Sequence, residues 1–374
     1  MGDKKRVMII FGGQSSEHEV SRVSATSIIK NIDRNKFDVS ILGITKEGRW
    51  MPYNGPIEKI ATGEWEALAA SSTKSLSEDN NVIDSIINDE LIPTENNSIV
   101  NVGKKRPNVD VIFPVLHGSN GEDGTIQGLF EIAGVPYVGP GVLGSALGMD
   151  KIYAKIIFEK AGIPQADYLY CTRKGVNDNI DSIVERIEGK FAYPVFVKPS
   201  NAGSSVGVSK ARDKNELIGA LNFAAKYDRK ILIEEFINGR EVECAVLGND
   251  EPIASTVGEI VPSNDFYDYK AKYIDNKSQV IIPAELPEET IQKVRDNAVK
   301  AFKALDCAGL SRVDFFVHRE NGNVFINEIN TIPGFTSISM YPMLWEASGI
   351  PYAELIERLI DLAVERFEDN TKEI

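Results

Sequence analysis

Cysteine, histidine and long apolar runs are all scarce in this 374-residue chain. The three cysteines, Cys171, Cys244 and Cys307, are widely spaced and odd in number, which argues against a disulfide framework or a cysteine-built metal site. The last two lie in apolar contexts and are expected in the core. No apolar run has the length of a transmembrane helix, and the charged first residues lead directly into a strand rather than a signal peptide. We therefore expect a cytoplasmic protein without a membrane partner.

Basic side chains are in the minority. The chain has 41 Lys and Arg against 55 Asp and Glu, a formal net charge of −14. This balance disfavours nucleic acid and anionic membranes as partners, because neutralising phosphate needs a basic surface. With 43% hydrophobic and 26% charged residues, the composition is that of an ordinary globular protein, long enough for two or three domains.

Two stretches near the carboxyl end, 309–318 and 323–331, alternate as strands do and are joined by a tight turn. We expect a three-residue loop over 320–322 with its glycine in the left-handed conformation. This loop makes Arg319 the partner of Asn323, and it sets the register of the whole hairpin.

One face of the expected hairpin carries only polar side chains. The register places Asp314 opposite Glu328 and Arg312 opposite Asn330. Two carboxylates, an amide oxygen and a guanidinium suit Mg²⁺ held against nucleotide phosphates, with the arginine on a developing negative charge. A solvated sheet face with cross-strand ion pairs is the alternative. The Pro-Gly loop that follows Thr331 favours a site, because such loops often form the rim of one.

The first part of the chain has the pattern of a βαβ unit. Strands are expected at 7–11, 37–44 and 109–113, with a helix after the first strand that runs to about Ile32. The acidic stretch 61–108 is only weakly periodic, and we assign it no function.

A single helix is expected from about Ser145 to Ala161. The block that follows has antiparallel α+β character, with strands expected at 195–198, 206–209, 231–235 and 241–247. Apolar residues at spacings of three and four predict core-packing helices after Pro287 and from Tyr352.

A run rich in glycine and serine follows the strand that ends at Lys198. Its backbone amides, the Ser204 and Ser205 hydroxyls and the Lys198 ammonium can approach phosphate oxygens. The run is not a Walker A sequence, and a plain hairpin turn explains it equally well. Lys151 is a second candidate phosphate ligand. Beyond the next strand, the backbone after Glu234 could bind a purine and Glu241 could hold ribose hydroxyls, although an acidic strand end is the simpler alternative.

Strand ends in the first unit carry two further candidates. Glu17 follows the first strand, where α/β sheets place their ligands, and could pair with a substrate ammonium. His117 ends the third strand and should point into the same crevice, although a lone histidine is more often structural. For Ser15 or Ser16, a helix cap is the simpler alternative to a role in binding.

A long irregular loop, 264–283, mixes aromatic residues with lysines, as active-site lids often do. Lys272 could reach phosphate, and Tyr273 could close over a substrate. Near the hairpin, the Gly334 N–H and Arg312 would together form an oxyanion site.

Taken in this order, these segments resemble the D-alanine–D-alanine ligases of the ATP-grasp superfamily. The resemblance covers nearly the whole chain through seven motifs: Gly12–Ser21, Leu116–Thr125, Met149–Lys151, Lys198–Gly207, Tyr269–Tyr273, Arg312–Asp314 and Glu328–Thr336. It implies an α/β protein of three domains, 1–138, 139–234 and 235–374. The first would be Rossmann-like, and ATP would lie between two antiparallel sheets of the other two. A homodimer is also implied.

The resemblance assigns roles to individual residues. It implies ATP binding by Lys151, Lys198, Ser204, Ser205, Glu234, Glu235, Phe236, Ile237, Glu241, Lys272, Asn327 and Glu328. It implies two Mg²⁺, with Mn²⁺ able to substitute, on Asp314, Glu328 and Asn330. The amino-acid substrates would contact Glu17, His117, Lys272, Ser339 and Met340. Glu17 would hold the ammonium of the first D-alanine and connect through Ser204 to Tyr273, while Arg312 and Gly334 hold the oxyanion.

The implied reaction makes peptidoglycan precursors in two steps. The first D-alanine takes the γ-phosphoryl group of ATP, and the amine of the second D-alanine then attacks the acyl phosphate. Relatives in vancomycin-resistant bacteria use D-lactate or D-serine as acceptor, and the Lys-Ala-Lys-Tyr context of Tyr273 favours D-alanine. The rival hypotheses are an ATP-grasp ligase with another acceptor and a regulatory protein without catalysis. A regulatory protein would be expected to lack one of Arg312, Asp314, Glu328 and Asn330.

Overall fold

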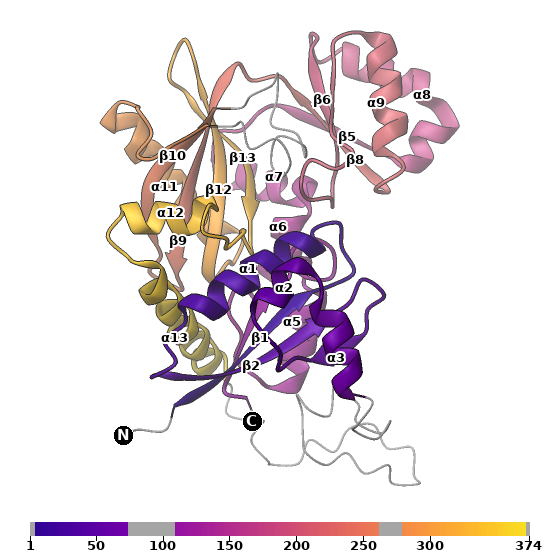
Figure 1. Ribbon diagram of the computed structural model, residues 1–374. Helices are drawn as coiled ribbons and strands as arrows, with labels where there is room; N and C mark the ends of the chain where they lie inside the picture. The colour runs from indigo at the N-terminus through magenta and orange to yellow at the C-terminus, as the bar shows by residue number, and fades with distance from the viewer. Residues whose placement is uncertain (1–3, 74–108, 262–278, 372–374) are drawn as a thin grey trace.

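The computed structural model describes residues 4–73, 109–261 and 279–371. Within these ranges the chain forms three sheets, called A, B and C here (Figure 1). No helix in this part of the chain is long and apolar enough to cross a membrane. Lys272, Tyr273 and most of the expected loop 264–283 lie outside the described residues.

Sheet A is the expected βαβ unit. It contains β1 (Lys5–Gly12), β2 (Phe37–Ile44), β3 (Trp50–Pro52) and β4 (Val111–Val115), with helices α1 (His18–Asn31), α2 (Glu58–Thr62), α3 (Trp65–Thr73) and α5 (Thr125–Ala133). The strand order is β3-β2-β1-β4, and β1 pairs in parallel with both of its neighbours. The prediction of β2 matches its bounds, whereas β4 lies two residues further along the chain than predicted.

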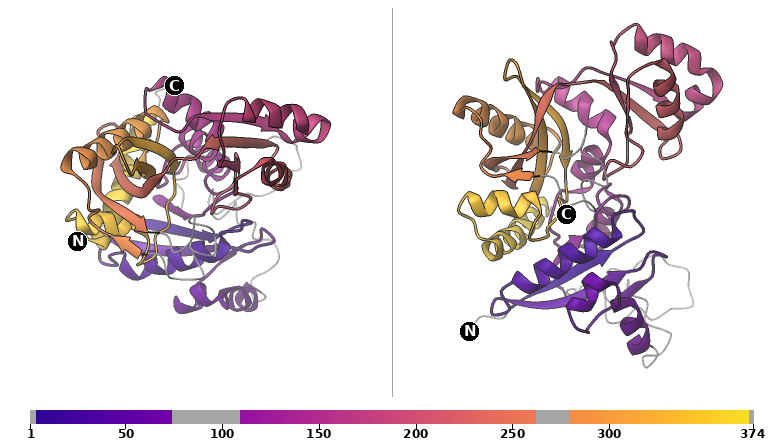
Figure 2. Two further views of the ribbon diagram at one scale, coloured as in Figure 1. Left: turned by 90° about the horizontal axis from the view of Figure 1, so that it is seen from above. Right: turned by 45° about the horizontal axis from the view of Figure 1, so that its top comes forward.

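Sheet C is entirely antiparallel, in the order β5-β8-β6-β7. Its elements are β5 (Tyr168–Thr172), α8 (Arg173–Glu188), β6 (Val195–Pro199), β7 (Ser209–Ala211), α9 (Lys214–Ala224) and β8 (Lys230–Glu235). Figures 1 and 2 show α8 and α9 on the outer side of this sheet, away from the other two. The strand predicted at 206–209 begins only at Ser209, because Ser204, Ser205 and Gly207 have positive φ angles that no strand can contain.

Sheet B is also antiparallel, in the order β11-β10-β9-β12-β13. Its elements are β9 (Gly239–Gly248), β10 (Ile253–Val261), β11 (Gln279–Ile281), α11 (Glu288–Ala304), β12 (Gly309–His318), β13 (Val324–Asn330), α12 (Met340–Ala347) and α13 (Tyr352–Asn370). The predicted helices after Pro287 and from Tyr352 are confirmed as α11 and α13.

The single helix predicted over 145–161 is wrong. The chain forms α6 (Val142–Met149) and α7 (Lys151–Lys160), separated by Asp150 in an extended conformation. The Asp150 carboxylate accepts hydrogen bonds from the Ile152 and Tyr153 amides, which caps α7. It also forms an ion pair with Lys230, so the break between the helices joins α7 to sheet C.

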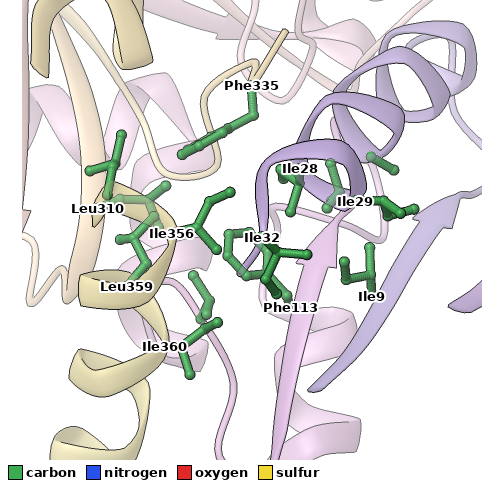
Figure 3. Packing of buried hydrophobic residues seen from close by; sticks show 14 of the residues in the cluster. Ile9, Ile28, Ile29, Ile32, Phe113, Leu310, Phe335, Ile356, Leu359 and Ile360 are labelled. Atoms are coloured by element: carbon green, nitrogen blue, oxygen red, sulfur yellow. The ribbon is translucent and has the colours of Figure 1, made fainter. Parts of the chain in front are cut away.

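One hydrophobic core joins sheet A to sheet B. The buried face of α13 packs against α1 and β4, and Figure 3 shows Ile356 pointing toward Ile32 and Phe113. Sheet C has a separate core of its own under α8 and α9. All three cysteines are buried thiols, as expected for the two in apolar contexts.

Truncating α13 inside this shared core should destabilise the protein. Leu359 is fully buried, and Leu359→Ala is expected to lower the free energy of unfolding by about 2–5 kcal/mol. Ile132 on α5 is 73% exposed, and Ile132→Ala should change it by no more than about 0.5 kcal/mol. Urea unfolding followed by circular dichroism measures both. Equal effects would contradict the importance of the α13 contact.

Candidate active site

The polar face of the β12–β13 hairpin forms as predicted. Arg312 lies opposite Asn330, and Asp314 lies opposite Glu328. The guanidinium contacts both carboxylate oxygens of Asp314, at 2.7 Å from Nε and 2.8 Å from Nη2. Asn330 Nδ2 donates to Asp314 Oδ2 at 3.0 Å. The Arg312 and Asp314 side chains are only 18% and 14% exposed, so this is not the solvated sheet face considered as the alternative.

The loop between the two strands is longer than predicted. His318, not Arg319, pairs with Asn323, with an N–O distance of 2.8 Å, so four residues form the loop. Gly322 has a φ of 69°, the left-handed conformation expected of it. A bulge between Ile326 and Glu328 adds one residue, Asn327, to β13 and restores the predicted pairs.

A cavity of about 1050 Å³ lies between the three sheets. Each of the predicted site residues that the structure describes lines it: Glu17, His117, Lys151, Lys198, Ser204, Ser205, Glu234, Glu235, Phe236, Ile237, Glu241, Arg312, Asp314, Asn327, Glu328, Asn330, Gly334, Ser339 and Met340. Residues from distant parts of the sequence therefore share one cleft.

The buried Glu234 carboxylate of sheet C contacts lysines from two elements. Lys155 and Lys198 both contact Glu234, each at 2.7 Å, and Lys198 Nζ also donates to Asn327 Oδ1 at 3.1 Å. Burial alone would raise the pKa of the Glu234 carboxyl, but the two ammonium groups outweigh it and lower the pKa to about 2. Lys155 was missed by the sequence prediction, although its spacing of four from Lys151 places both on one side of α7.

Lys151 begins α7 and joins it to the glycine- and serine-rich loop. Its Nζ lies 3.2 Å from Glu328 Oε2 and donates to the Ala202 carbonyl at 3.0 Å, while its backbone N–H donates to the Ser200 carbonyl. The N-terminus of α7 and the loop therefore lie side by side, and Lys151 and residues 202–205 all line the cleft.

The same loop reaches across the cleft to sheet A. The Ser204 hydroxyl donates to the Glu17 carboxylate, which is buried. Ser204 and Ser205 have φ angles of 50° and 58°, a conformation that is costly for serine and is typical of functional loops.

His117 is buried at the end of β4. Its Nδ1 lies 2.9 Å from the Ile332 carbonyl, which can only accept, so Nδ1 carries the proton. Burial lowers the pKa of the His117 ring, although nearby Glu17 opposes this, and the ring is therefore neutral. His117 lines the cleft, and its Nε2 has no hydrogen-bond partner among the described residues.

Glu122 was also missed. Its carboxylate accepts from the Gly118 amide at 2.7 Å and from the Ile332 amide at 3.1 Å, and so ties the His117 loop to the loop after β13. Burial, together with the charge of Glu17, raises the pKa of Glu122 to about 8. The sequence signal for Glu122 was an acidic residue in the glycine-rich run 121–124, close after His117.

The loop after β13 is fixed by hydrogen bonds of its own. Ser339 Oγ accepts from the Thr336 amide at 3.0 Å, and the Phe335 amide donates to Ser24 Oγ at 3.1 Å. A Cβ on Gly334 would lie 3.1 Å from Ser339 Oγ. Glycine therefore allows Ser339 to lie close to the backbone at this position, and both residues line the cleft.

Family models match two long parts of the chain. The model described as the D-ala D-ala ligase N-terminus matches residues 6–140, and the one described as the D-ala D-ala ligase C-terminus matches residues 157–361. The chain belongs to the D-alanine–D-alanine ligase family. The resemblance drawn from the motifs is thus confirmed.

Curated members of this family match along the full length. The D-alanine–D-alanine ligase of Acetivibrio thermocellus is 69% identical, covering 100% of this chain and 99% of the relative. That of Ruminiclostridium cellulolyticum is 65% identical, covering 99% and 98%.

Solved structures give the same fold. The VanG D-Ala:D-Ser ligase from Enterococcus faecalis superposes with a TM-score of 0.81 at 39% identity, covering 96% of this chain and 100% of that one. The D-alanine–D-alanine ligase from Coxiella burnetii also has a TM-score of 0.81, at 34% identity, covering 98% and 96%. The three sheets are those of the ATP-grasp fold in this family, as predicted.

The lowered pKa of Glu234 makes stability depend on pH. Because the pKa of Glu234 is lowered in the folded state, the ionised carboxylate stabilises the fold at pH values above its ordinary pKa of 4.5. That stabilisation is lost as the pH falls towards about 2. We expect this group to account for a loss of roughly 3 kcal/mol over that window. Glu234→Gln should be less stable at pH 7 and should show a correspondingly smaller acid-dependent loss.

Urea unfolding at pH 7, 4.5 and 2.5 measures this difference. Glu320→Gln, in the exposed hairpin loop, removes the same charge without a buried partner and serves as the control. A Glu234→Gln profile parallel to that of the unmodified chain would show that the ion pairs do not produce the effect.

Proposed function

We propose that the cleft joins two D-alanine molecules through an acyl phosphate, with the residue roles given below. The overall reaction, ATP-dependent synthesis of D-alanyl-D-alanine for peptidoglycan precursors, is that of the family. The observation that carries the residue roles is the single cleft in which the Arg312–Asp314 pair and the Ser204–Glu17 hydrogen bond both lie.

In this proposal ATP binds along sheets B and C. Lys151 and Lys198 neutralise its phosphates together with Ser205 and the loop amides, and Lys272 adds a further charge. The backbone of 234–237 binds the purine, and Glu241 holds the ribose. The proximity of Lys151 to Glu328, at 3.2 Å, supports this placement, because phosphate and metal ligands must be adjacent.

Two Mg²⁺, or Mn²⁺ in their place, would be held by Asp314, Glu328 and Asn330. Among the described residues no three His, Cys, Asp or Glu side chains gather into a metal site by themselves, so phosphate oxygens would have to complete the coordination. The donors fit magnesium, since two carboxylates and an amide are hard oxygen ligands. Asn330 Nδ2 faces Asp314, so its other amide atom, the oxygen, remains for a cation. When bound, the metal would neutralise charge on the transferring phosphoryl group.

The first step places a D-alanine against Glu17, which binds its ammonium. The carboxylate of this D-alanine attacks the γ-phosphorus of ATP, forming the carboxyl–phosphate bond as the bond to ADP breaks. His117, neutral and protonated at Nδ1, presents Nε2 towards this substrate. Glu122 holds the His117 loop in place through the Gly118 amide.

The second D-alanine attacks the acyl phosphate with its free amine, while Ser339 and Met340 hold its other end. The Gly334 N–H and the Arg312 guanidinium stabilise the resulting oxyanion, which collapses as phosphate leaves and the attacking nitrogen loses one proton. Tyr273 would connect through Ser204 to Glu17 and help to exclude water from the acyl phosphate.

Other parts of the proposal concern the whole molecule. We propose domains at 1–138, 139–234 and 235–374, a homodimer and a cytoplasmic location. D-Serine is the second candidate acceptor, because the E. faecalis protein at 39% identity is a D-Ala:D-Ser ligase. The sequence around Tyr273 favours D-alanine.

Acceptor specificity can be measured directly. With ATP, Mg²⁺ and D-alanine, we expect release of ADP and phosphate and a dipeptide product identified by mass. L-Alanine should give no product, and D-serine or D-lactate offered beside D-alanine should compete poorly near neutral pH. A marked preference for D-lactate or D-serine would contradict the proposed acceptor.

Replacing the oxyanion arginine should separate binding from catalysis. Arg312→Ala is expected to lower kcat by about 10²–10³-fold, because one charged donor to the oxyanion is lost, while ATP binding is retained. Arg358→Ala, on the exposed face of α13, should leave both unchanged. Steady-state kinetics and ATP titration by calorimetry report the two effects. Normal turnover by Arg312→Ala would remove this residue from the oxyanion role.

A further inference from the structure

Glu243 is a buried carboxylate in the cleft wall that the roles above do not use. It lies on β9 directly beside Asp314 on β12, and Asp314 in turn lies beside Glu328 on β13. Its exposed fraction is 6%. Three carboxylates thus stand in a row across three adjacent strands, an arrangement that is unfavourable unless cations lie among them.

Arg312 is the cation that Glu243 and Asp314 share. Its Nε lies 2.8 Å from Glu243 Oε2 and 2.7 Å from Asp314 Oδ1, while Nη2 lies 2.8 Å from Asp314 Oδ2. The single N–H on Nε can point to only one oxygen at a time. In this structure it bonds to Asp314, and Glu243 Oε2 lies at nearly the same distance as the alternative acceptor.

Asp314 faces competing demands. Its oxygens accept from Arg312 and from Asn330, and under the proposed function they must also bind a metal. An oxygen that coordinates a divalent cation is a weaker acceptor for a guanidinium. Arg312 then needs another anion to keep its position, because its own cross-strand neighbour on β9 is Ala245, which has no polar side chain.

We propose that Glu243 is a positioning residue for the oxyanion arginine. It holds the Arg312 guanidinium in the cleft when Asp314 turns to the metal, and it lets Asp314 release Arg312 without leaving a buried charge unpaired. This inference rests on the proposed function, in which Arg312 stabilises the oxyanion and Asp314 binds Mg²⁺.

The test compares Glu243→Gln with Glu243→Asp and with a matched control. Glu259 is an equally buried glutamate of the same sheet and lines the same cleft, but it pairs with Arg240, so Glu259→Gln is the control. Two readouts are used: Mn²⁺ binding in the presence of ADP, followed by electron paramagnetic resonance, and kcat and KM at saturating Mg²⁺.

Glu243→Gln should lower kcat by roughly 10–100-fold while KM for ATP and for D-alanine changes little, because the oxyanion donor is misplaced and not lost. Mn²⁺ affinity should fall by about 10-fold, since Asp314 must then hold Arg312 alone. Glu243→Asp keeps the charge on a shorter side chain and should recover most of the Mn²⁺ affinity and part of kcat. Glu259→Gln should change neither quantity by more than about 2-fold.

The proposal is overturned if Glu243→Gln and Glu259→Gln have the same Mn²⁺ affinity and kcat. It is also overturned if Glu243→Gln weakens Mn²⁺ binding but keeps full kcat at saturating metal, because loss of one negative charge near the metal would explain that result. If circular dichroism shows that Glu243→Gln does not fold, the test rests on Glu243→Asp. A kcat of Glu243→Asp equal to that of the unmodified protein would then refute the proposal. Arg312→Ala distinguishes a failure of the proposed function from a failure of the Glu243 proposal. Normal turnover by Arg312→Ala defeats the proposed function itself, whereas lost turnover beside unaffected Glu243 variants defeats only the present inference.

Discussion

The register of the β12–β13 hairpin is the constraint on which the cleft depends. Its four-residue loop alone would place Asp314 opposite Asn327 and Arg312 opposite the apolar Ile329. The single extra residue at the bulge shifts β13 by one position, so that Asp314 meets Glu328 instead. The bulge also turns two consecutive polar residues, Asn327 and Glu328, towards the cleft, where strict alternation would allow only one.

Charge compensation explains how an acidic protein builds this cleft. Two carboxylates in the wall are matched by cations on neighbouring elements. Glu234 on β8 has Lys155 and Lys198, and Glu328 on β13 has Lys151. The net charge of −14 therefore says little about the site, because the basic residues that matter are concentrated where phosphate would bind.

The sequence predicted the site better than it predicted the connections between elements. Alternation alone identified the polar face of the hairpin, because side-chain direction in a strand follows directly from residue number. The break at Asp150 was missed because the flanking residues continue an apolar helical pattern without proline. The only sequence signal for the new helix is Asp150 itself, a residue type that is favoured at the N-cap.

Tertiary contacts account for the other omissions. Lys155 lies on a helix whose visible pattern is apolar, and only the position of Glu234 on a strand about 80 residues later gives it a partner. Glu122 is similar, since its carboxylate binds the Ile332 amide, which the sequence gives no way to place nearby. The bulge had a local signal, namely two adjacent polar residues in an otherwise alternating strand, but nothing local sets the length of the loop before it.

The contacts across the cleft also determine what a nucleotide would replace. Sheets A and B share one hydrophobic core, whereas sheet C has its own core and reaches the others through polar groups such as Lys198 with Asn327 and Lys230 with Asp150. Under the proposed function, the phosphates would take the place of the partners of Lys151 and Lys198, and metal would take the place of the Lys151 contact on Glu328. Lys151, Lys198 and Glu328 then each exchange one partner for another, so these charges are compensated in both states. Such an exchange reduces the desolvation cost of binding, because the lysines have already left bulk water before the nucleotide arrives.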